Sequence, residues 1–273
     1  MTPTIDDAVR TLRGRRIAVL TGAGVSTDSG IPDYRGEGAP VRTPMTVQQF
    51  LAGDQARRRY WVGSHLGWLR FASTLPNEGH RALARLERDG ISNGVTTQNV
   101  DGLHLQAGSG RVVELHGTSR RAVCLHCGQV FDRRDLAVRI DAENPWLVAS
   151  PDAVLLPDGD VRPDSVDGFV LPTCTVCGGM LKPDVVFFGE VVPVARFAGA
   201  EQMLAAADAL LVAGSSLVVN SGMRLVQRAE RRGLPIVIVN RGQTRADARA
   251  DVKIDAGTSE VLAELAERLK ARA

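Results

Sequence analysis

The stretch that decides the fold reads IAVLTGAGVSTDSGIPDYRG and covers residues 17–36. Its apolar start, Ile17–Leu20, is typical of a buried strand, and Gly22 and Gly24 follow in a turn that we expect to lead into a helix. Glycine lets a backbone approach a pyrophosphate closely, and a helix N-terminus presents unpaired N–H groups to it. The stretch therefore indicates a nucleotide-binding turn, with an ordinary strand–turn–helix as the alternative.

The match to the dinucleotide fingerprint is incomplete, because Thr27 stands where a third glycine is expected. The residues that follow strengthen the prediction of a nucleotide-binding turn. A second tight turn, Gly30-Ile31-Pro32, leads into a loop that carries Arg35, and an arginine just beyond a phosphate turn can clamp an anionic cofactor.

Length and composition bound the class of protein. The chain has 273 residues, of which 44% are hydrophobic and 23% charged, which suits one large domain and a small companion. A formal net charge of +2 favours neither nucleic acid nor a membrane surface as a partner. The sequence shows no run of about twenty apolar residues and no signal-peptide core, so we expect a cytoplasmic protein.

The four cysteines form two Cys-x-x-Cys pairs, Cys124 with Cys127 and Cys174 with Cys177. Together they offer four tetrahedral thiolate ligands for zinc, and a site closed by four cysteines is structural. Disulfides would suit a reducing cytoplasm poorly, and a redox role would need one reactive pair. Residues 141–173, rich in Pro, Asp and Gly, are predicted to be an insertion within this module.

Strand-like and helical stretches alternate in the rest of the chain, which predicts an α/β fold with a mostly parallel sheet covered on both faces. Ligands of such sheets bind beyond the carboxyl ends of the strands. We expect strands at 16–21, 95–97, 112–115, 185–188, 209–213 and 235–239. We expect helices at 46–52, 54–73, from the Asn77 cap to Gly90, 221–232 and 258–272.

Polar side chains gather at the ends of four of these strands. They are Gln98-Asn99-Val100-Asp101, His116-Gly117, Gly214-Ser215-Ser216 and Asn240-Arg241-Gly242. Singly, each has a structural explanation as a helix cap or a satisfied buried histidine. Turns do not need Gln, His and Arg together, so the set predicts one site at this edge of the sheet.

Several of these segments resemble the signature motifs of sirtuins, in the same order along the chain. They are residues 22–35, 97–104, 114–117, 181–190 and 214–216, with the two cysteine pairs between them. The resemblance extends from residue 15 to residue 262. Residues 177–189, the long insertion before Cys174 and Arg59-Tyr60-Trp61 resemble the class II branch, which includes sirtuin 4 and bacterial relatives.

The resemblance implies a Rossmann-like NAD-binding domain of residues 1–118 and 182–273, and a small zinc-ribbon domain of residues 119–181. It also implies an enzyme that uses NAD as co-substrate to remove an acyl group from lysine in protein substrates, releasing nicotinamide and O-acyl-ADP-ribose. One structural zinc ion and a monomeric chain are expected.

Residue roles follow from the same resemblance. His116 would be the general base, Asn99 would orient the ribose and a water, and Asp101 would bind the nicotinamide carboxamide. Substrate backbone would pair, as an added strand, with Val185, Val186, Phe187, Phe188 and Gly189. The other expected cofactor contacts are Gly22, Ala23, Gly24, Ser26, Asp33, Tyr34, Arg35, Gln98, Val100, Gly214, Ser215, Ser216, Asn240, Arg241, Gly242 and Thr258.

One departure bears on the acyl group. Sirtuins that remove negatively charged acyl groups carry a Tyr-x-x-Arg pair, but here Tyr60 is followed by Gly63. Succinyl and malonyl groups are therefore disfavoured, and acetyl, longer aliphatic and lipoyl-type groups stay open. Mono-ADP-ribosyl transfer on the same scaffold is the alternative activity. A non-enzymatic NAD-binding or zinc-ribbon adaptor would not need His116, Asn99 and Asp101 together.

Overall fold

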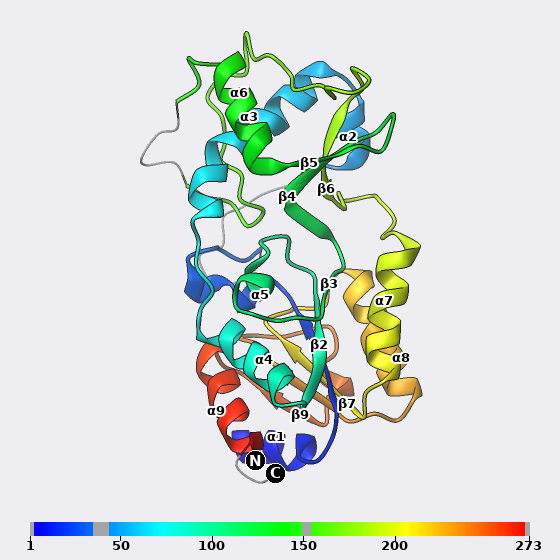
Figure 1. Ribbon diagram of the computed structural model, residues 1–273. Coiled ribbons are helices and arrows are strands. Elements are labelled where there is room, and N and C mark those ends of the chain that lie inside the picture. The colour runs from blue at the N-terminus through cyan, green and yellow to red at the C-terminus, as the bar shows by residue number, and fades with distance from the viewer. Residues whose placement is uncertain (1–2, 35–43, 149–153, 271–273) are drawn as a thin grey trace.

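Six parallel strands form the sheet of the larger of two lobes, in the order β3-β2-β1-β7-β8-β9 (Figure 1). The structure is a computed structural model that describes residues 3–34, 44–148 and 154–270. The strands are β1 (Ile17–Thr21), β2 (Ser92–Thr97), β3 (Val112–Glu114), β7 (Ala209–Ala213), β8 (Ile236–Val239) and β9 (Val252–Ile254).

Helices cover both faces of this sheet. Ile17 and Val19 of β1 pack in one core with α1 (Ile5–Leu12), α4 (Glu78–Arg88) and α9 (Thr258–Lys270). Ala18 and Leu20 point to the opposite core, with α7 (Val194–Ala205) and α8 (Asn220–Arg231). Because both faces are buried, β1 is a continuous apolar run and not an alternating one.

The strand order places a switch point at the centre of the sheet. From β1 the chain adds β2 and β3 on one side, and later β7, β8 and β9 on the other. In open α/β sheets a crevice for ligands forms at such a point, outside the carboxyl ends of the strands. The predicted fold class is confirmed.

The smaller lobe is built on an antiparallel sheet of order β5-β4-β6, formed by β4 (Gly117–Cys124), β5 (Val130–Asp132) and β6 (Leu181–Val185). Its core joins Trp61 of α3 (Asp54–Ala72) to Ile140 of α6 (Arg133–Glu143) and to Phe169. Figure 1 shows α3 and α6 beside this sheet, with α2 (Val47–Leu51) nearby. We therefore propose that α3 folds with the predicted small domain of residues 119–181.

Two local predictions were wrong. Residues 185–188 add no strand to the parallel sheet, because β6 ends at Val185 and pairs antiparallel with β4 in the small lobe. Nor does an α-helix follow Gly24. The chain makes two single 3₁₀ turns, Ala23–Val25 and Thr27–Ser29, and Gly30 ends the second with φ of 86°. The turn therefore lacks the helix dipole expected from the fingerprint.

Other predicted helices are confirmed, and some elements went unpredicted. The Asn77 side chain accepts from the His80 N–H at 3.3 Å and caps α4, and Gly90 adopts φ of 72° beyond its end. The sequence did not predict α1, α6, α7, β9 or the short α5 (Leu103–Gln106). Within the described ranges, none of the helices has the length and apolarity needed to span a bilayer.

Part of the predicted insertion packs against two glycines of α3. A Cβ on Gly67 would lie 1.9 Å from the Gly159 carbonyl oxygen, and one on Gly63 would lie 2.5 Å from that of Val161. The Val161 N–H also donates to the Gly63 carbonyl at 3.0 Å. A side chain at either glycine would push the insertion away from α3.

We expect Gly67→Ala to destabilise the protein by about 1–3 kcal/mol, because the new methyl group overlaps the Gly159 carbonyl. Alanine is otherwise the better helix former by about 1 kcal/mol. The matched control is Gly199→Ala in α7, where the added Cβ would meet Val113 at an ordinary 3.5 Å. Denaturant unfolding measures both variants, and a stabilised Gly67→Ala protein would contradict this packing.

Candidate active site

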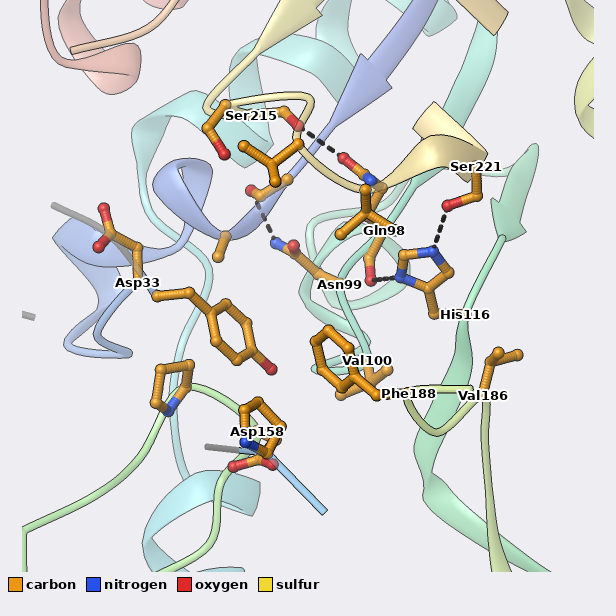
Figure 2. A pocket seen from close by; sticks show the side chains of 18 of the residues that line it. Asp33, Gln98, Asn99, Val100, His116, Asp158, Val186, Phe188, Ser215 and Ser221 are labelled. Atoms are coloured by element: carbon orange, nitrogen blue, oxygen red, sulfur yellow. Dashed lines mark hydrogen bonds between the residues drawn. The ribbon is translucent and has the colours of Figure 1, made fainter. Parts of the chain in front are cut away.

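A cavity of about 570 Å³ lies at the carboxyl ends of the strands, where the sequence predicts a site. Its wall combines residues that follow β1, β2, β3, β7 and β8 with residues that follow β6. Figure 2 shows part of this wall, with Gln98, His116 and Ser215 among the labelled side chains. Its volume falls within the usual range for small-molecule and cofactor sites. Five strand ends of the parallel sheet thus contribute to one chamber.

The loops after β1 and β7 touch at the switch point. The Gly24 N–H donates to the Gly214 carbonyl at 2.8 Å, and a Cβ on Gly22 would lie 2.8 Å from the same oxygen. Gly214 itself has φ of 63°, and a Cβ there would lie 2.3 Å from the Val25 nitrogen. These glycines are therefore required for contact between the two loops, whatever they do for a ligand.

His116 follows β3 and is held at both ring nitrogens. Its Nδ1 lies 2.9 Å from the Gln98 carbonyl oxygen, and its Nε2 lies 2.7 Å from Ser221 Oγ (Figure 2). A carbonyl can only accept, so Nδ1 carries the proton and Nε2 is the basic nitrogen. Burial lowers the pKa of His116 below its ordinary value, against the opposing effect of the Gln98 carbonyl. The imidazole is thus neutral and able to accept a proton.

Gln98 ties the strand ends together. Its N–H donates to the Thr21 carbonyl at 2.9 Å, and its side-chain Oε1 accepts from Ser215 Oγ at 2.6 Å. Through Gln98, the loop after β7 fixes the loop after β2, which in turn orients His116.

Asn99, Asp101 and Ser26 form a second network in the cavity wall. The Asn99 amide donates to the Gly22 carbonyl and to Ser26 Oγ, both at 3.1 Å. Ser26 Oγ donates to Asp101 Oδ2 at 2.7 Å, and the Leu103 N–H donates to Asp101 Oδ1 at 2.9 Å. The Asp101 carboxylate is therefore buried with two donors that stabilise its charge.

A pair of buried histidines lies behind this network. The rings of His80 and His104 are 4.8 Å apart, and His104 Nε2 lies 2.9 Å from Thr21 Oγ1. Burial lowers the pKa of His80 to about 4 and that of His104 well below its ordinary value, although the Asp101 charge opposes the shift at His80. Both rings are neutral near pH 7 and add no positive charge to the site.

Most other predicted cofactor contacts also line the cavity. Among the contacts that the structure describes, Thr258 is the one that does not line the cavity. It lies behind the wall, where its hydroxyl donates to the Gly24 carbonyl at 3.3 Å. Arg35 lies outside the described residues. The predicted contacts that line the cavity are Gly22, Ala23, Gly24, Ser26, Asp33, Tyr34, Gln98, Asn99, Val100, Asp101, Gly214, Ser215, Ser216, Asn240, Arg241 and Gly242.

The predicted substrate segment, residues 185–189, forms another part of the wall. The half-buried Glu190 braces it, because its carboxylate accepts from the Phe187 N–H at 2.6 Å and lies 3.0 Å from Lys182 Nζ. No local sequence pattern marks several further lining residues from other elements, because only folding brings them here. Among them are Pro157, Asp158, Ser221 and Arg224.

The four cysteines of the small lobe converge. Their sulfur atoms all lie within 4.8 Å of one another, with Cys124 and Cys177 at 3.6 Å and Cys127 and Cys174 at 3.7 Å. Four thiolates bound to zinc in a tetrahedron would be about 3.8 Å apart, whereas a disulfide requires about 2.0 Å. The cluster is consistent with a structural zinc ion. The nearby Gly179 is required, because a Cβ there would lie 3.0 Å from the Cys124 sulfur.

These features define a class of protein: an α/β enzyme with a nucleotide crevice, a half-buried neutral base and a four-cysteine lobe. A family profile described as the Sir2 family matches residues 22–221. The chain belongs to the Sir2 family, which confirms the predicted resemblance to sirtuins.

Similar proteins span nearly the whole chain. "NAD-dependent protein deacetylase 1" of Mycobacterium avium (strain 104) is 51% identical over 267 residues, 96% of this chain and 95% of that protein. "NAD-dependent protein deacylase Sirt4" of Drosophila melanogaster is 42% identical over 275 residues, 96% of this chain and 88% of that protein. A solved structure described as "Sir2-p53 peptide-NAD+" has a TM-score of 0.78 and 30% identity, and covers 97% of this chain and 98% of that one.

Replacing Cys174 with Ser should remove bound zinc and unfold the small lobe, because structural zinc in such modules contributes on the order of 10 kcal/mol. The control is Thr175→Ser, at an exposed position in the same Cys-x-x-Cys turn. Elemental analysis and thermal melting measure the outcome. A Cys174→Ser protein that is metal-free yet as stable as the control would refute a structural metal.

Proposed function

We propose that this chain is an NAD-dependent protein deacetylase with His116 as its general base. The observation that carries the proposal is the neutral His116 imidazole, whose basic Nε2 belongs to the wall of a cavity at the switch point of a Rossmann-like sheet. Relatives named as NAD-dependent deacetylases, 51% and 50% identical to the chain, support it.

In the proposed reaction, the acetyl group passes from a lysine side chain to ADP-ribose as nicotinamide is released. His116 Nε2 accepts a proton from the ribose hydroxyl that attacks the transferred group. The low pKa keeps the ring unprotonated at neutral pH, and general-base catalysis of this kind contributes about 10²–10⁴-fold in rate.

Asn99 and Asp101 would position the nicotinamide half of the substrate. The Asn99 nitrogen is engaged by Gly22 and Ser26, and its Oδ1 accepts no hydrogen bond from the described residues, which leaves it for a ribose hydroxyl. The Asp101 carboxylate is fixed by Ser26 and by the Leu103 N–H, so it is preorganised to hold a carboxamide. We propose that Asn240–Gly242 serve the adenosine half.

The acyl-lysine would enter beside residues 185–189. We propose that this segment binds substrate backbone as an added strand, since Glu190 and Lys182 already hold its shape. Phe187 stacks on Phe50 and meets Tyr60 edge-on, with ring centroids 5.1 and 5.2 Å apart. Phe187 and Tyr60 line the cavity and give the acyl group an apolar wall, and the buried Phe50 packs behind them.

The same packing argues against negatively charged acyl groups. An arginine at position 63 would collide with the Val161 carbonyl, because even a Cβ there would lie 2.5 Å away. The Asp158 carboxylate also lines the cavity, near Tyr60, whose pKa is raised mainly by burial and further by the charges of Asp160 and Asp158. We therefore propose acetyl and other uncharged acyl groups as substrates.

The partners we propose are acyl-lysine proteins, met by a monomeric chain in the cytoplasm. The four described cysteines form no disulfide, which suits a reducing compartment. The balanced net charge of +2 gives no reason to expect nucleic acid.

Replacing His116 with Ala should lower kcat for an acetyl-lysine peptide by at least about 10²-fold, because the reaction loses its base. The melting temperature should change little. Mass spectrometry of deacetylated peptide and O-acetyl-ADP-ribose measures the effect, with the exposed His126→Ala as control. Full turnover by His116→Ala would remove this residue from the mechanism, and labelled protein in place of O-acetyl-ADP-ribose would indicate ADP-ribosyl transfer.

On one peptide scaffold, acetyl-lysine should be deacylated with at least a tenfold higher kcat/KM than succinyl-lysine, a difference of about 1.4 kcal/mol. Replacing Asp158 with Asn should narrow this ratio by weakening the repulsion of the succinyl carboxylate. A wild-type preference for succinyl-lysine would overturn the proposed specificity.

A further inference from the structure

The basic nitrogen of His116 already has a partner in the structure, and it comes from a different element. Ser221 Oγ lies 2.7 Å from His116 Nε2 (Figure 2). Ser221 belongs to the first turn of α8, is 8% exposed and lines the cavity. Its neighbours in sequence carry no motif that marks it as a site residue.

The direction of this hydrogen bond follows from the other side of the ring. The Gln98 carbonyl must accept from Nδ1, which leaves a lone pair on Nε2 of the neutral imidazole. Ser221 is therefore the donor. The ring is held at two points, by the backbone after β2 and by the start of α8.

The start of α8 is itself fixed. A Cβ on Gly222 would lie 2.9 Å from Gln98 Nε2, so the helix backbone passes close to the Gln98 side chain. That side chain accepts from Ser215 Oγ at 2.6 Å. Ser221 therefore has little freedom to move relative to Gln98, and the imidazole between them is oriented by both.

We propose that Ser221 is a positioning residue for His116. Its hydroxyl directs Nε2 into the cavity and holds the place that the attacking ribose hydroxyl takes when substrate binds. Donation from Ser221 also stabilises the neutral ring, which is the form that a general base needs. The inference rests on the proposed role of His116 as the base.

Other charged and titratable groups near the His116 ring also influence its pKa or line the same cavity. Arg196 of α7 disfavours protonation of His116 by its positive charge. Burial raises the pKa of Glu114, two residues before His116 on β3. Arg224 of α8 and Asp101, in the loop after β2, line the same cavity. None of these groups changes in a Ser221 variant, so a shift in the pH profile reports on the lost hydroxyl.

The test is S221A, measured by deacetylation kinetics across pH. Loss of the donated hydrogen bond should raise the pKa of His116 in the free enzyme, so the acidic limb of the kcat/KM profile should move up by roughly half a unit or more. At neutral pH, kcat should fall about tenfold through misalignment of the base. Nicotinamide exchange into NAD should stay near the wild-type rate, because it precedes the step that uses the base.

Three further variants make the result specific. S221T keeps a hydroxyl, so the acidic limb of its pH profile and its kcat should match those of the wild type. S221C keeps the side-chain shape but has a weaker donor, so its acidic limb and its kcat should lie between those of the wild type and S221A. It also provides the test if S221A folds poorly. The matched control is S109A, at a buried serine, 4% exposed, whose Oγ has no partner within the described residues. It should leave the profile unchanged.

Two results would overturn the inference. One is S221A with an unchanged limb and kcat. The other is an equal loss of exchange and deacetylation together with a lower melting temperature, which would mean a purely structural role. If H116A also retains turnover, the proposed function fails. If H116A is inactive and S221A is unaltered, only the role of Ser221 fails.

Discussion

The contact between the loops after β1 and β7 is the constraint on which the site depends. The backbones of Gly24 and Gly214 are joined by a hydrogen bond of 2.8 Å, and a Cβ on Gly22, Gly24 or Gly214 would lie 3.0 Å or less from the facing loop. The parallel pairing of β1 and β7 brings these loops together at the switch point. Only glycines let them meet, and their contact sets where Ser215 and Ser26 lie.

Hydrogen bonds connect this contact to the other residues of the site and fix their positions. Ser215 fixes Gln98, the Gln98 carbonyl fixes His116, and Ser26 fixes Asp101. Burial then decides the charge states: the imidazoles of His116, His80 and His104 are kept neutral, while the Asp101 carboxylate is stabilised by its donors. The site thus combines an uncharged base with a fixed anion, and both depend on backbone positions set by the sheet.

The small lobe was harder to predict than the sheet, and for a physical reason. Parallel strands buried on both faces, such as Ile17–Thr21, are short apolar runs that stand out in a sequence. The cysteine pairs stand out too, because their spacing is imposed by the ligands of a metal. By contrast, the polar β4 and the extended segment around Gly159 and Val161 have no periodicity. β4 is held by its pairing with β5 and β6, and the segment by its packing on α3, and no local pattern indicates either.

The sequence by itself determined the family, the parallel sheet, the four-cysteine cluster and most of the cavity wall, since each depends on residue types at fixed spacing. Only the tertiary structure decided that residues 185–188 leave the sheet, that Thr258 lies behind the cavity, and that Ser221 meets His116. These outcomes depend on how separate elements pack. A residue's own neighbours in sequence carry no record of the partner that folding brings to it across 105 positions, as it brings Ser221 to His116.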